Sequence, residues 1–314
     1  MSGPTLILGA VGAAAVSLVL TPVAGWFAAR IGAVDEPDER RAHERPTPSC
    51  GGIAIFIGFW IAVAATTWPL PRPMLALFVA SSVLLIVSVI DDARGLSPIL
   101  RLVVHFGLAA GLWWLGGIRI EGVTWPFGSE GPHYVALGVW SLPLTVLWIA
   151  VIVNALNWLD GMDGLAAGTA AIAAVPLTVL AFHMDSPNVA CMGAALCGAS
   201  VGFVRYNVKP ARIFMGDAGA MFLGLILACM AVMGTPLKGA AVAMLAPVVV
   251  LGVPIYDVLS TMTKRLLSGK PVHIGDRGHV HHRLLGRGWS EDVVVLVLWM
   301  ATALLGVVAM YLLR

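Results

Sequence analysis

The sequence predicts an all-α fold, a polytopic membrane bundle of about ten transmembrane helices with both termini outside. Of its 314 residues, 59% are hydrophobic and only 11% are charged, and the mean hydropathy is +0.91. Soluble domains carry about 25% charged residues, so this composition indicates a protein embedded in a bilayer. Two further observations support the fold: long apolar runs recur, and lysine and arginine are unevenly distributed between the segments that join them.

Apolar runs of membrane-spanning length recur along the whole chain. A hydrocarbon core of about 30 Å requires about 20 apolar residues in a helix. No basic residue precedes the first run, so we expect a retained span rather than a cleaved signal. No internal repeat or linker is visible, and 1–314 is predicted to be a single integral membrane domain. The predicted spans are approximately 5–29, 51–69, 74–90, 97–117, 135–153, 164–183, 188–204, 218–236, 240–262 and 293–313.

Lysine and arginine are concentrated on one side of the predicted bundle. The connections on that side, together with Arg101, hold 15 of the 19 basic residues. By the positive-inside rule, these connections lie in the cytoplasm and both termini lie outside. So strong an imbalance supports an even number of spans. The cytoplasmic segments are 30–50, 91–96, 154–163, 205–217 and 263–292.

Five aspartates lie at span ends, all on the predicted cytoplasmic side: Asp91, Asp92, Asp160, Asp163 and Asp217. A carboxylate at the bilayer centre costs roughly 2.5–3.5 kcal/mol on insertion scales, so acids within membrane segments indicate function. Here the acids avoid the centre and gather at one interface. This arrangement predicts a divalent metal ion and a phosphorylated ligand at the membrane surface.

Each acidic segment also has a structural interpretation. The pair after the third span could be neutralised by Arg94 and Arg101. Asp163 or Asp217 could cap the helix that follows it by accepting free N–H groups. Capping requires only one aspartate, however, whereas 154–164 contains two asparagines, two aspartates and two glycines. That segment is more typical of a polar ligand site.

Two basic segments complete the cytoplasmic side. In 263–292, His279, His281 and His282 fall within four residues and precede Arg283. Histidines among arginines suit a diphosphate and its sugar. Zinc is an alternative, although structural zinc sites often use cysteine and this loop has none. A basic loop that is solvated or binds lipid headgroups is another. In 30–50, the arginines that include Arg45 could meet lipid phosphate or could only anchor the chain.

The chain resembles the polyprenyl-phosphate N-acetylhexosamine-1-phosphate transferases, glycosyltransferase family 4, in five blocks of residues and in the order of these blocks. The resemblance covers essentially the whole chain, and the histidine block is similar to that of the bacterial undecaprenyl-phosphate GlcNAc-1-phosphate transferases. The matching blocks are Arg45-Pro-Thr-Pro with Gly51-Gly52, Asp91-Asp92 with Leu96-Ser97, Asn157-x-x-Asp160-Gly-x-Asp163-Gly, Phe214-Met-Gly-Asp217-x-Gly and Asp276-Arg-Gly-His279-x-His281-His282-Arg.

The resemblance implies ten or eleven transmembrane helices, a cytoplasmic active site and Mg²⁺, with Mn²⁺ as an alternative. It also implies roles by position. The metal role falls on Asp217 and Asp92, and catalytic roles fall on Asp91, Asp92, Arg101 and Asp160. Nucleotide binding falls on Asn157, Asp163, Asn207 and Phe214, the last stacking on uracil, and sugar and diphosphate binding on Arg45, His279, His281, His282 and Arg283.

The implied reaction transfers an N-acetylhexosamine 1-phosphate, with GlcNAc as the first choice, from a UDP-sugar to polyprenyl phosphate and releases UMP. It would begin a lipid-linked glycan at the cytoplasmic face of the bacterial inner (plasma) membrane. A lipid phosphate with a second pKa of about 6 is largely dianionic at neutral pH. We therefore favour its direct attack on the β-phosphorus over a covalent aspartyl-phosphate.

Two other functions remain as alternatives. One is transfer of phospho-MurNAc-pentapeptide within the same family. The other is secondary transport, although transporters place ionisable residues near the midplane at repeat interfaces. A lysine often found after the acidic pair in the family is Arg94 or Arg101 here, and arginine cannot act as a neutral base. The expected partners are a UDP-N-acetylhexosamine, polyprenyl phosphate, the bilayer and a second copy of the chain, with no nucleic acid.

Overall fold

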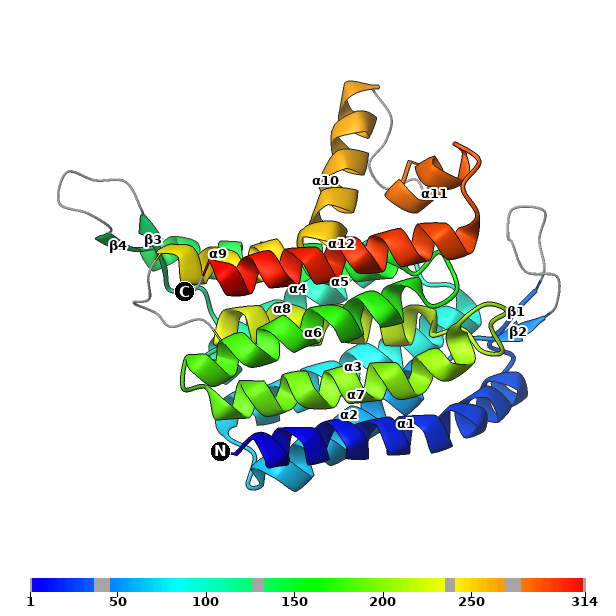
Figure 1. The fold of residues 1–314 in the computed structure, drawn as a ribbon, viewed down its shortest axis with the longest axis horizontal. Helices are drawn as coiled ribbons and strands as arrows, with labels where there is room; N and C mark the ends of the chain where they lie inside the picture. The colour runs from blue at the N-terminus through cyan, green and yellow to red at the C-terminus, as the bar shows by residue number, and fades with distance from the viewer. Residues whose placement is uncertain (1, 37–45, 126–132, 235–240, 269–277, 313–314) are drawn as a thin grey trace.

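Long helices lie side by side in one bundle, and a single helix, α10, stands across the bundle direction (Figure 1). The computed structural model describes residues 2–36, 46–125, 133–234, 241–268 and 278–312. Its helices are α1 (Gly3–Ile31), α2 (Gly52–Thr67), α3 (Arg72–Arg94), α4 (Pro98–Gly111), η1 (Leu112–Gly116), η2 (Gly138–Trp140), α5 (Ser141–Leu159), α6 (Leu165–His183), α7 (Pro187–Asn207), α8 (Gly216–Met233), α9 (Ala241–Val250), α10 (Gly252–Leu267), α11 (Val280–Leu285) and α12 (Glu291–Tyr311). Two antiparallel strand pairs join β1 (Val34–Asp35) to β2 (Thr47–Pro48) and β3 (Gly122–Trp125) to β4 (His133–Ala136).

The predicted all-α membrane fold is confirmed. Within the described ranges, eight helical segments are long and apolar enough to cross a membrane. They match eight of the predicted spans and comprise α1, α3, α4 with η1, η2 with α5, α6, α7, α8 and α12. The second predicted span appears as α2, an apolar helix of 16 residues.

The ninth predicted span, 240–262, is wrong as a single helix. The chain is divided at Leu251 into α9 and α10. Gly252 has a low helix propensity. Pro254 has no N–H to donate to the carbonyl of Val250, so a continuous helix would lose a hydrogen bond here. α10 therefore leaves the direction of the bundle (Figure 1).

Three predicted connections are shorter in the structure because the helices continue beyond their apolar runs. α5 extends to Leu159, so Asn154 and Asn157 lie on a helix rather than in a loop. α7 likewise continues to Asn207, and α3 continues to Arg94. Helical hydrogen bonds do not require apolar side chains at a polar interface, so the end of an apolar run does not mark the end of the helix.

Both termini lie at the same end of the bundle as β3 and β4 (Figure 1). The β1–β2 pair and α11 lie toward the opposite end. A chain that starts and ends at the same end crosses the bundle an even number of times, as the distribution of basic residues predicts. At the end opposite the termini, α3, α5 and α7 end, and α4, α6 and α8 begin.

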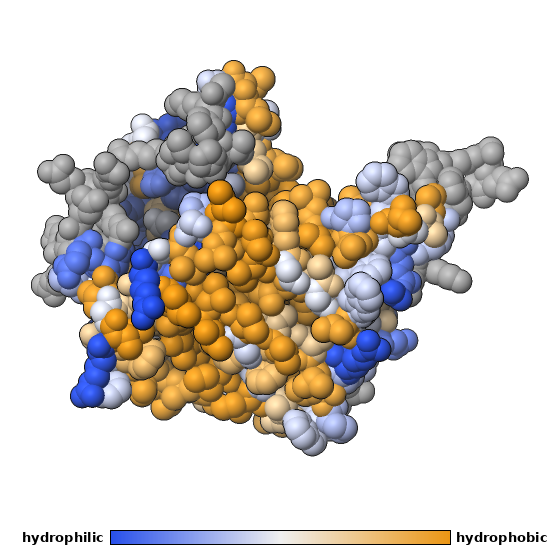
Figure 2. Space-filling view, turned by 180° about the vertical axis from the view of Figure 1, so that it is seen from behind, coloured by the Kyte–Doolittle hydropathy of each residue, from blue (hydrophilic) through white to orange (hydrophobic). Residues whose placement is uncertain are grey.

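The inner helices are α6, α7 and α8. In the most apolar 18-residue stretch of each of these helices, 72%, 72% and 78% of the residues are buried, compared with 22% for α1. Figure 2 shows a broad hydrophobic face with hydrophilic residues toward two opposite ends. Because outer helices expose apolar side chains over this face, the surface is suited to contact with lipid.

The start of α2 packs against the start of α8 with almost no space between the backbones. Gly51 N and Gly52 N donate to the carbonyl oxygens of Phe214 and Met215, each at 3.0 Å. A Cβ at Gly52 would lie 2.2 Å from the backbone nitrogen of Gly219. Glycine at this position therefore allows the segment before α8 to dock on α2.

We expect Gly52→Ala to destabilise the protein by about 1–3 kcal/mol, because the added methyl group overlaps backbone atoms that cannot rotate away. Thermal unfolding in detergent measures the effect as a lower Tm. Gly107→Ala is the matched control, since a Cβ there meets no atom within 4 Å. Equal Tm values for the two variants would contradict the prediction.

Candidate active site

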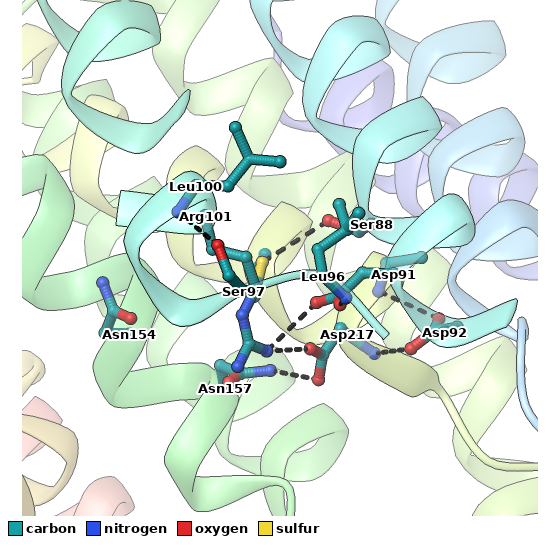
Figure 3. Close-up of polar contacts among 12 residues, drawn as sticks. Ser88, Asp91, Asp92, Leu96, Ser97, Leu100, Arg101, Asn154, Asn157 and Asp217 are labelled. Carbon is teal, nitrogen blue, oxygen red and sulfur yellow. Dashed lines mark hydrogen bonds and ion pairs between the residues drawn. The ribbon is translucent and has the colours of Figure 1, made fainter. Parts of the chain in front are cut away.

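Arg101 joins two aspartates at the end of the bundle opposite the termini (Figure 3). Its Nη1 lies 2.8 Å from Oδ2 of Asp217 and 3.0 Å from Oδ2 of Asp91. Asn157 Nδ2 donates to the other oxygen of Asp217 at 2.6 Å. These four side chains come from α4, α8, α3 and α5. The site is therefore built from four helices, of which only α3 and α4 are neighbours in sequence.

The members of this cluster differ in access to solvent. The side chain of Asp91 is 6% exposed, whereas those of Arg101 and Asp217 are 31% and 28% exposed. The single positive charge of Arg101 is shared between the carboxylates of Asp91 and Asp217. Asp217 and Arg101 are thus more accessible to a ligand than Asp91.

Asp92 points to the start of α8 rather than to Arg101 (Figure 3). It accepts from the backbone N–H groups of Asp217 at 3.0 Å and Ala218 at 3.4 Å. A carboxylate at these free N–H groups compensates the positive end of the helix. Gly216 has φ +72°, and a Cβ on it would lie 2.5 Å from Oδ2 of Asp92. Asp92 therefore caps α8 from a neighbouring helix and fixes the backbone of Asp217.

The structural alternative for Asp217, a helix cap, is not what the structure shows. Its side chain accepts from Asn157 and Arg101, and the cap is provided by Asp92. The alternative for Asp91, neutralisation by an arginine, is present as the ion pair with Arg101. That pair does not exclude a function, because the same Arg101 also binds Asp217.

The residues that follow the acidic pair place Arg101. Leu96 N donates to Oδ1 of Asp91 at 2.5 Å, which turns the chain after α3. Ser97 then begins α4 by accepting from Leu100 N at 3.2 Å. Since Arg101 lies one turn into this helix, its side chain reaches back toward Asp91.

Asp163 and Asn207 connect the α5–α6 turn to the segment before α8. Asp163 Oδ2 accepts from Ala211 N at 2.9 Å. Asn207 is 3% exposed, and it accepts from Gly164 N at 3.1 Å and donates to the carbonyl of Ile213 at 3.0 Å. The N-cap residue of α6 is Gly164, so Asp163 lies one residue before the cap position. Both residues position loops in this structure, and their nucleotide role remains a prediction.

Phe214 lies in the same segment and is half-buried. Its backbone N–H donates to the carbonyl of Pro48 at 2.8 Å, and it forms a parallel bridge with Ser49. The segment is thus held on the β2–α2 turn. Arg45, predicted to bind the sugar diphosphate, lies outside the described residues.

Asp160 follows the last residue of α5. Burial raises its pKa well above the ordinary value, and the negative charges of Asp217 and Asp92 raise it further. The structure brings three of the five sequence-predicted aspartates, Asp91, Asp92 and Asp217, together around Arg101 and the start of α8, while Asp163 turns toward Ala211.

The histidine block packs against the α5–α6 turn. The ring of His279 meets Trp158 edge-on at 5.4 Å between centroids. His281 is 1% exposed, and its Nε2 lies 2.6 Å from where a Cβ of Gly161 would be. Burial, followed by the charge of His282, lowers the pKa of His281 to about 4, so the buried ring is neutral at pH 7.

The remaining members of the block lie toward other partners. The ring of His282 lies 4.3 Å from that of His281. Arg283 Nη2 donates to Ser260 Oγ at 3.1 Å, and its guanidinium lies 5.8 Å from the ring centroid of Tyr256. Arg283 thus contacts α10, and its predicted diphosphate role is untested.

One buried acid of this region is missing from the sequence prediction. Asp257 on α10 is 0% exposed, and its Oδ2 lies 2.8 Å from Nδ1 of His279. It falls inside the predicted span 240–262. The available signal was an acidic residue soon after Gly252 and Pro254 within an apolar run, because such a residue is costly in lipid.

The carboxylate cluster has the donor chemistry that Mg²⁺ requires. Mg²⁺ prefers oxygen ligands and is commonly bound by one or two carboxylates, substrate phosphates and water. Asp217 is partly exposed, and Oδ2 of Asp91 faces Arg101 without forming a hydrogen bond. No group of three or more His, Cys, Asp or Glu residues in the described segments is arranged as a metal site. The residues fit a magnesium site of two carboxylates completed by phosphate.

Comparison with known proteins gives a family and several curated relatives. Residues 74–235 match the family model described as glycosyl transferase family 4. The chain is 34% identical over 283 residues to a probable undecaprenyl-phosphate N-acetylglucosaminyl 1-phosphate transferase of Bacillus subtilis, covering 90% of this chain and 78% of that protein. It is 33% identical over 320 residues to a decaprenyl-phosphate N-acetylglucosaminephosphotransferase of Mycobacterium tuberculosis, covering 92% and 78%. It is 25% identical over 291 residues to an undecaprenyl-phosphate alpha-N-acetylglucosaminyl 1-phosphate transferase of Escherichia coli K12, covering 90% and 78%.

Proposed function

Since this chain belongs to glycosyl transferase family 4, we propose that it transfers N-acetylglucosamine 1-phosphate from UDP-N-acetylglucosamine to a polyprenyl phosphate in the membrane and releases UMP. The main support is similarity over 90% of the chain to a relative named for this reaction. The carboxylate–arginine cluster at one end of a membrane bundle also supports it, because a lipid phosphate and a soluble nucleotide can meet there.

The cluster is suited to phosphoryl transfer by positioning and charge, which supply most of the catalysis in such reactions. Arg101 is partly exposed and can neutralise a phosphate oxygen. Asp217 holds the guanidinium in place and is itself held by Asn157. An oxygen of the lipid phosphate attacks the β-phosphorus of the donor. The bond from this phosphorus to the bridging oxygen breaks, and UMP leaves with that oxygen.

Direct attack is favoured over a covalent aspartyl-phosphate by the position of Asp92. Both of its oxygens accept backbone N–H groups at the start of α8, in Asp217 and Ala218. Attack by Asp92 on phosphorus would require it to leave that helix end. A dianionic lipid phosphate needs no such nucleophile.

We propose that Mg²⁺ would be held by Asp217 and one carboxylate of the adjacent pair. Family position implies Asp92, whose oxygens accept backbone N–H groups at the start of α8, whereas Asp91 Oδ2 lies in the cluster without a hydrogen bond to any described residue. Such an ion would neutralise the charge of the diphosphate and of the leaving UMP. Arg101 contributes a second positive charge from the protein itself. The stacked rings of His279 and His281 pack against Trp158 and Gly161 at the α5–α6 turn.

We propose that this end of the bundle faces the cytoplasm of a bacterial plasma membrane. The support is the 15 of 19 basic residues assigned to its connections and to Arg101. UDP-sugars are cytoplasmic substrates, so the donor would meet the cluster on that side. The predicted homodimer remains a prediction.

Purified protein tests the function directly. With UDP-N-acetylglucosamine, undecaprenyl phosphate and Mg²⁺, we expect UMP release that requires both substrates. A panel of UDP-sugars decides between the possible donors. If UDP-MurNAc-pentapeptide were the only donor that supports UMP release, the protein would be a phospho-MurNAc-pentapeptide transferase. Absence of UMP release with every UDP-N-acetylhexosamine would refute the transferase, and a transporter would release none.

We expect EDTA to lower UMP release about tenfold or more, because the proposed ion neutralises the diphosphate. Added Mg²⁺ in excess should restore the rate, and Mn²⁺ should restore at least part of it. Full activity after extensive chelation would contradict the metal proposal and would leave the transferase proposal intact.

A further inference from the structure

We propose that Asp257 is a positioning residue for the transfer reaction. It fixes the ring orientation and tautomer of His279 and thereby sets His279 and His281 against the α5–α6 turn. This inference rests on the proposed function, because it assigns Asp257 a part in the same site.

Asp257 is completely buried, and both of its oxygens are used. Oδ2 lies 2.8 Å from Nδ1 of His279, and Oδ1 accepts from Val280 N at 2.5 Å. A buried carboxylate is costly unless it is paired and hydrogen-bonded. Both partners here belong to two consecutive residues at the start of α11. The contacts of Asp257 therefore hold one short segment in place.

The break between α9 and α10 makes this contact geometrically accessible. In a continuous span through 240–262, Asp257 would lie inside the bilayer, at a cost of several kcal/mol. Because α10 instead stands across the bundle direction, it approaches α11 (Figure 1). The change of direction at α10 thus allows Asp257 to be buried against α11 instead of in lipid.

α10 directs a polar stripe of three buried residues inward. Asp257, Thr261 and Arg265 are 0%, 1% and 4% exposed and are spaced four residues apart, which places them on one helix face. Thr261 Oγ1 donates to the carbonyl of Gly278 at 3.4 Å. The guanidinium of Arg265 lies 5.8 Å from the ring centroid of Trp158. The stripe therefore connects α10 to the histidine block and to the end of α5.

The carboxylate determines the proton position on His279. An ionised carboxylate only accepts hydrogen bonds, so Nδ1 of His279 must carry the hydrogen and donate it. Nε2 is then the ring nitrogen that Asp257 does not engage. A carboxylate that orients a histidine in this way is a recurrent device in catalytic and metal sites.

The ring of His279 stacks on that of His281, which lies against the α5–α6 turn. The rings of His279 and His281 are parallel within 9°, with centroids 5.9 Å apart. His281 Nε2 lies against Gly161, next to Asp160, and Nδ1 of His281 is buried without a hydrogen-bond partner among the described residues. A displaced His279 would therefore change the surroundings of Asp160 as well.

Asp257→Asn tests the inference with little change in volume. The amide oxygen can still accept from Val280 N, but the amide nitrogen then faces Nδ1 of His279 and requires the opposite tautomer. We expect kcat for UMP release to fall about 10- to 100-fold, with KM for UDP-N-acetylglucosamine changed less than about threefold. Asp185→Asn, an exposed aspartate at the other end of the bundle, should leave activity unchanged.

A double-mutant cycle separates positioning from simple folding. In a His279→Ala background, Asp257→Asn should cost less than about twofold more activity, because its partner is already absent. A full additional loss would overturn the inference, since it would mean that Asp257 acts only on the fold. Wild-type kcat in Asp257→Asn would also overturn it.

Asp257→Glu guards against a variant that does not fold. It keeps an acceptor-only carboxylate, so it should lose less activity than Asp257→Asn, and the reverse order would overturn the inference. Tm values measured for each variant identify any loss due to unfolding. If wild-type protein releases no UMP, the proposed function fails; additivity in an active enzyme overturns only the role of Asp257.

Discussion

Replacing Asp217 with asparagine is expected to lower kcat for UMP release at least about a thousandfold. The two partners of this carboxylate, Arg101 Nη1 at 2.8 Å and Asn157 Nδ2 at 2.6 Å, are both donors. An amide has only one accepting atom, so one partner would face an N–H group. The variant also loses the charge that the proposed magnesium site requires.

Steady-state kinetics of UMP release and a Tm measurement test this prediction together. The backbone N–H of residue 217 still donates to Asp92, so α8 should remain capped and Tm should fall only slightly. Asp185→Asn provides the same chemical change at the opposite end of the bundle and should retain full activity. An Asp217→Asn enzyme with more than about a tenth of wild-type kcat would refute the metal and charge roles of Asp217.

Replacing Arg101 with alanine should produce the second largest effect, a loss of about 100- to 1000-fold in kcat/KM for UDP-N-acetylglucosamine. The substitution leaves Asp91 and Asp217 without the guanidinium that lies within 3.0 Å of each. Two unpaired carboxylates would repel each other and the diphosphate of the donor. Arg101→Lys should lose less, about tenfold, because lysine keeps the charge but not the planar fork of donors.

The matched control is Arg119→Ala on the opposite side of the bundle. Arg119 forms an exposed ion pair with Glu121 at 2.8 Å, and exposed pairs contribute about 0–1 kcal/mol. Its removal should leave both activity and Tm near the wild-type values. If Arg101→Ala behaved like this control, Arg101 would have no part in donor binding or transfer.

The sequence predicts the membrane class and the side on which the acids lie. Asp91, Asp92 and Asp217 each occur where an apolar run meets a polar segment, and the order of runs puts these ends together. The same reasoning fails at 240–262, where composition predicts one span and the structure has α9 and α10. Composition measures affinity for lipid, but a glycine and a proline at the centre of the run decide whether one helix can pass through it.

Side-chain partners in the site could not be predicted from the same patterns. Two adjacent aspartates look equivalent in the sequence, yet Asp91 pairs with Arg101 while Asp92 caps α8. Adjacent residues of a helix point about 100° apart, so each meets a different neighbouring helix. Which helix that is depends on packing between distant segments, such as the contact of Gly52 with Gly219.

The sequence by itself determined that this protein is a helical membrane bundle with its acids at one end, because transfer into lipid depends on the composition of each segment of about 20 residues. Only the tertiary structure decided that one guanidinium joins Asp91 to Asp217 and that Asp257 holds His279. Hydrogen bonds and ion pairs form within about 3 Å and at restricted angles, so they depend on how helices far apart in sequence are packed and oriented.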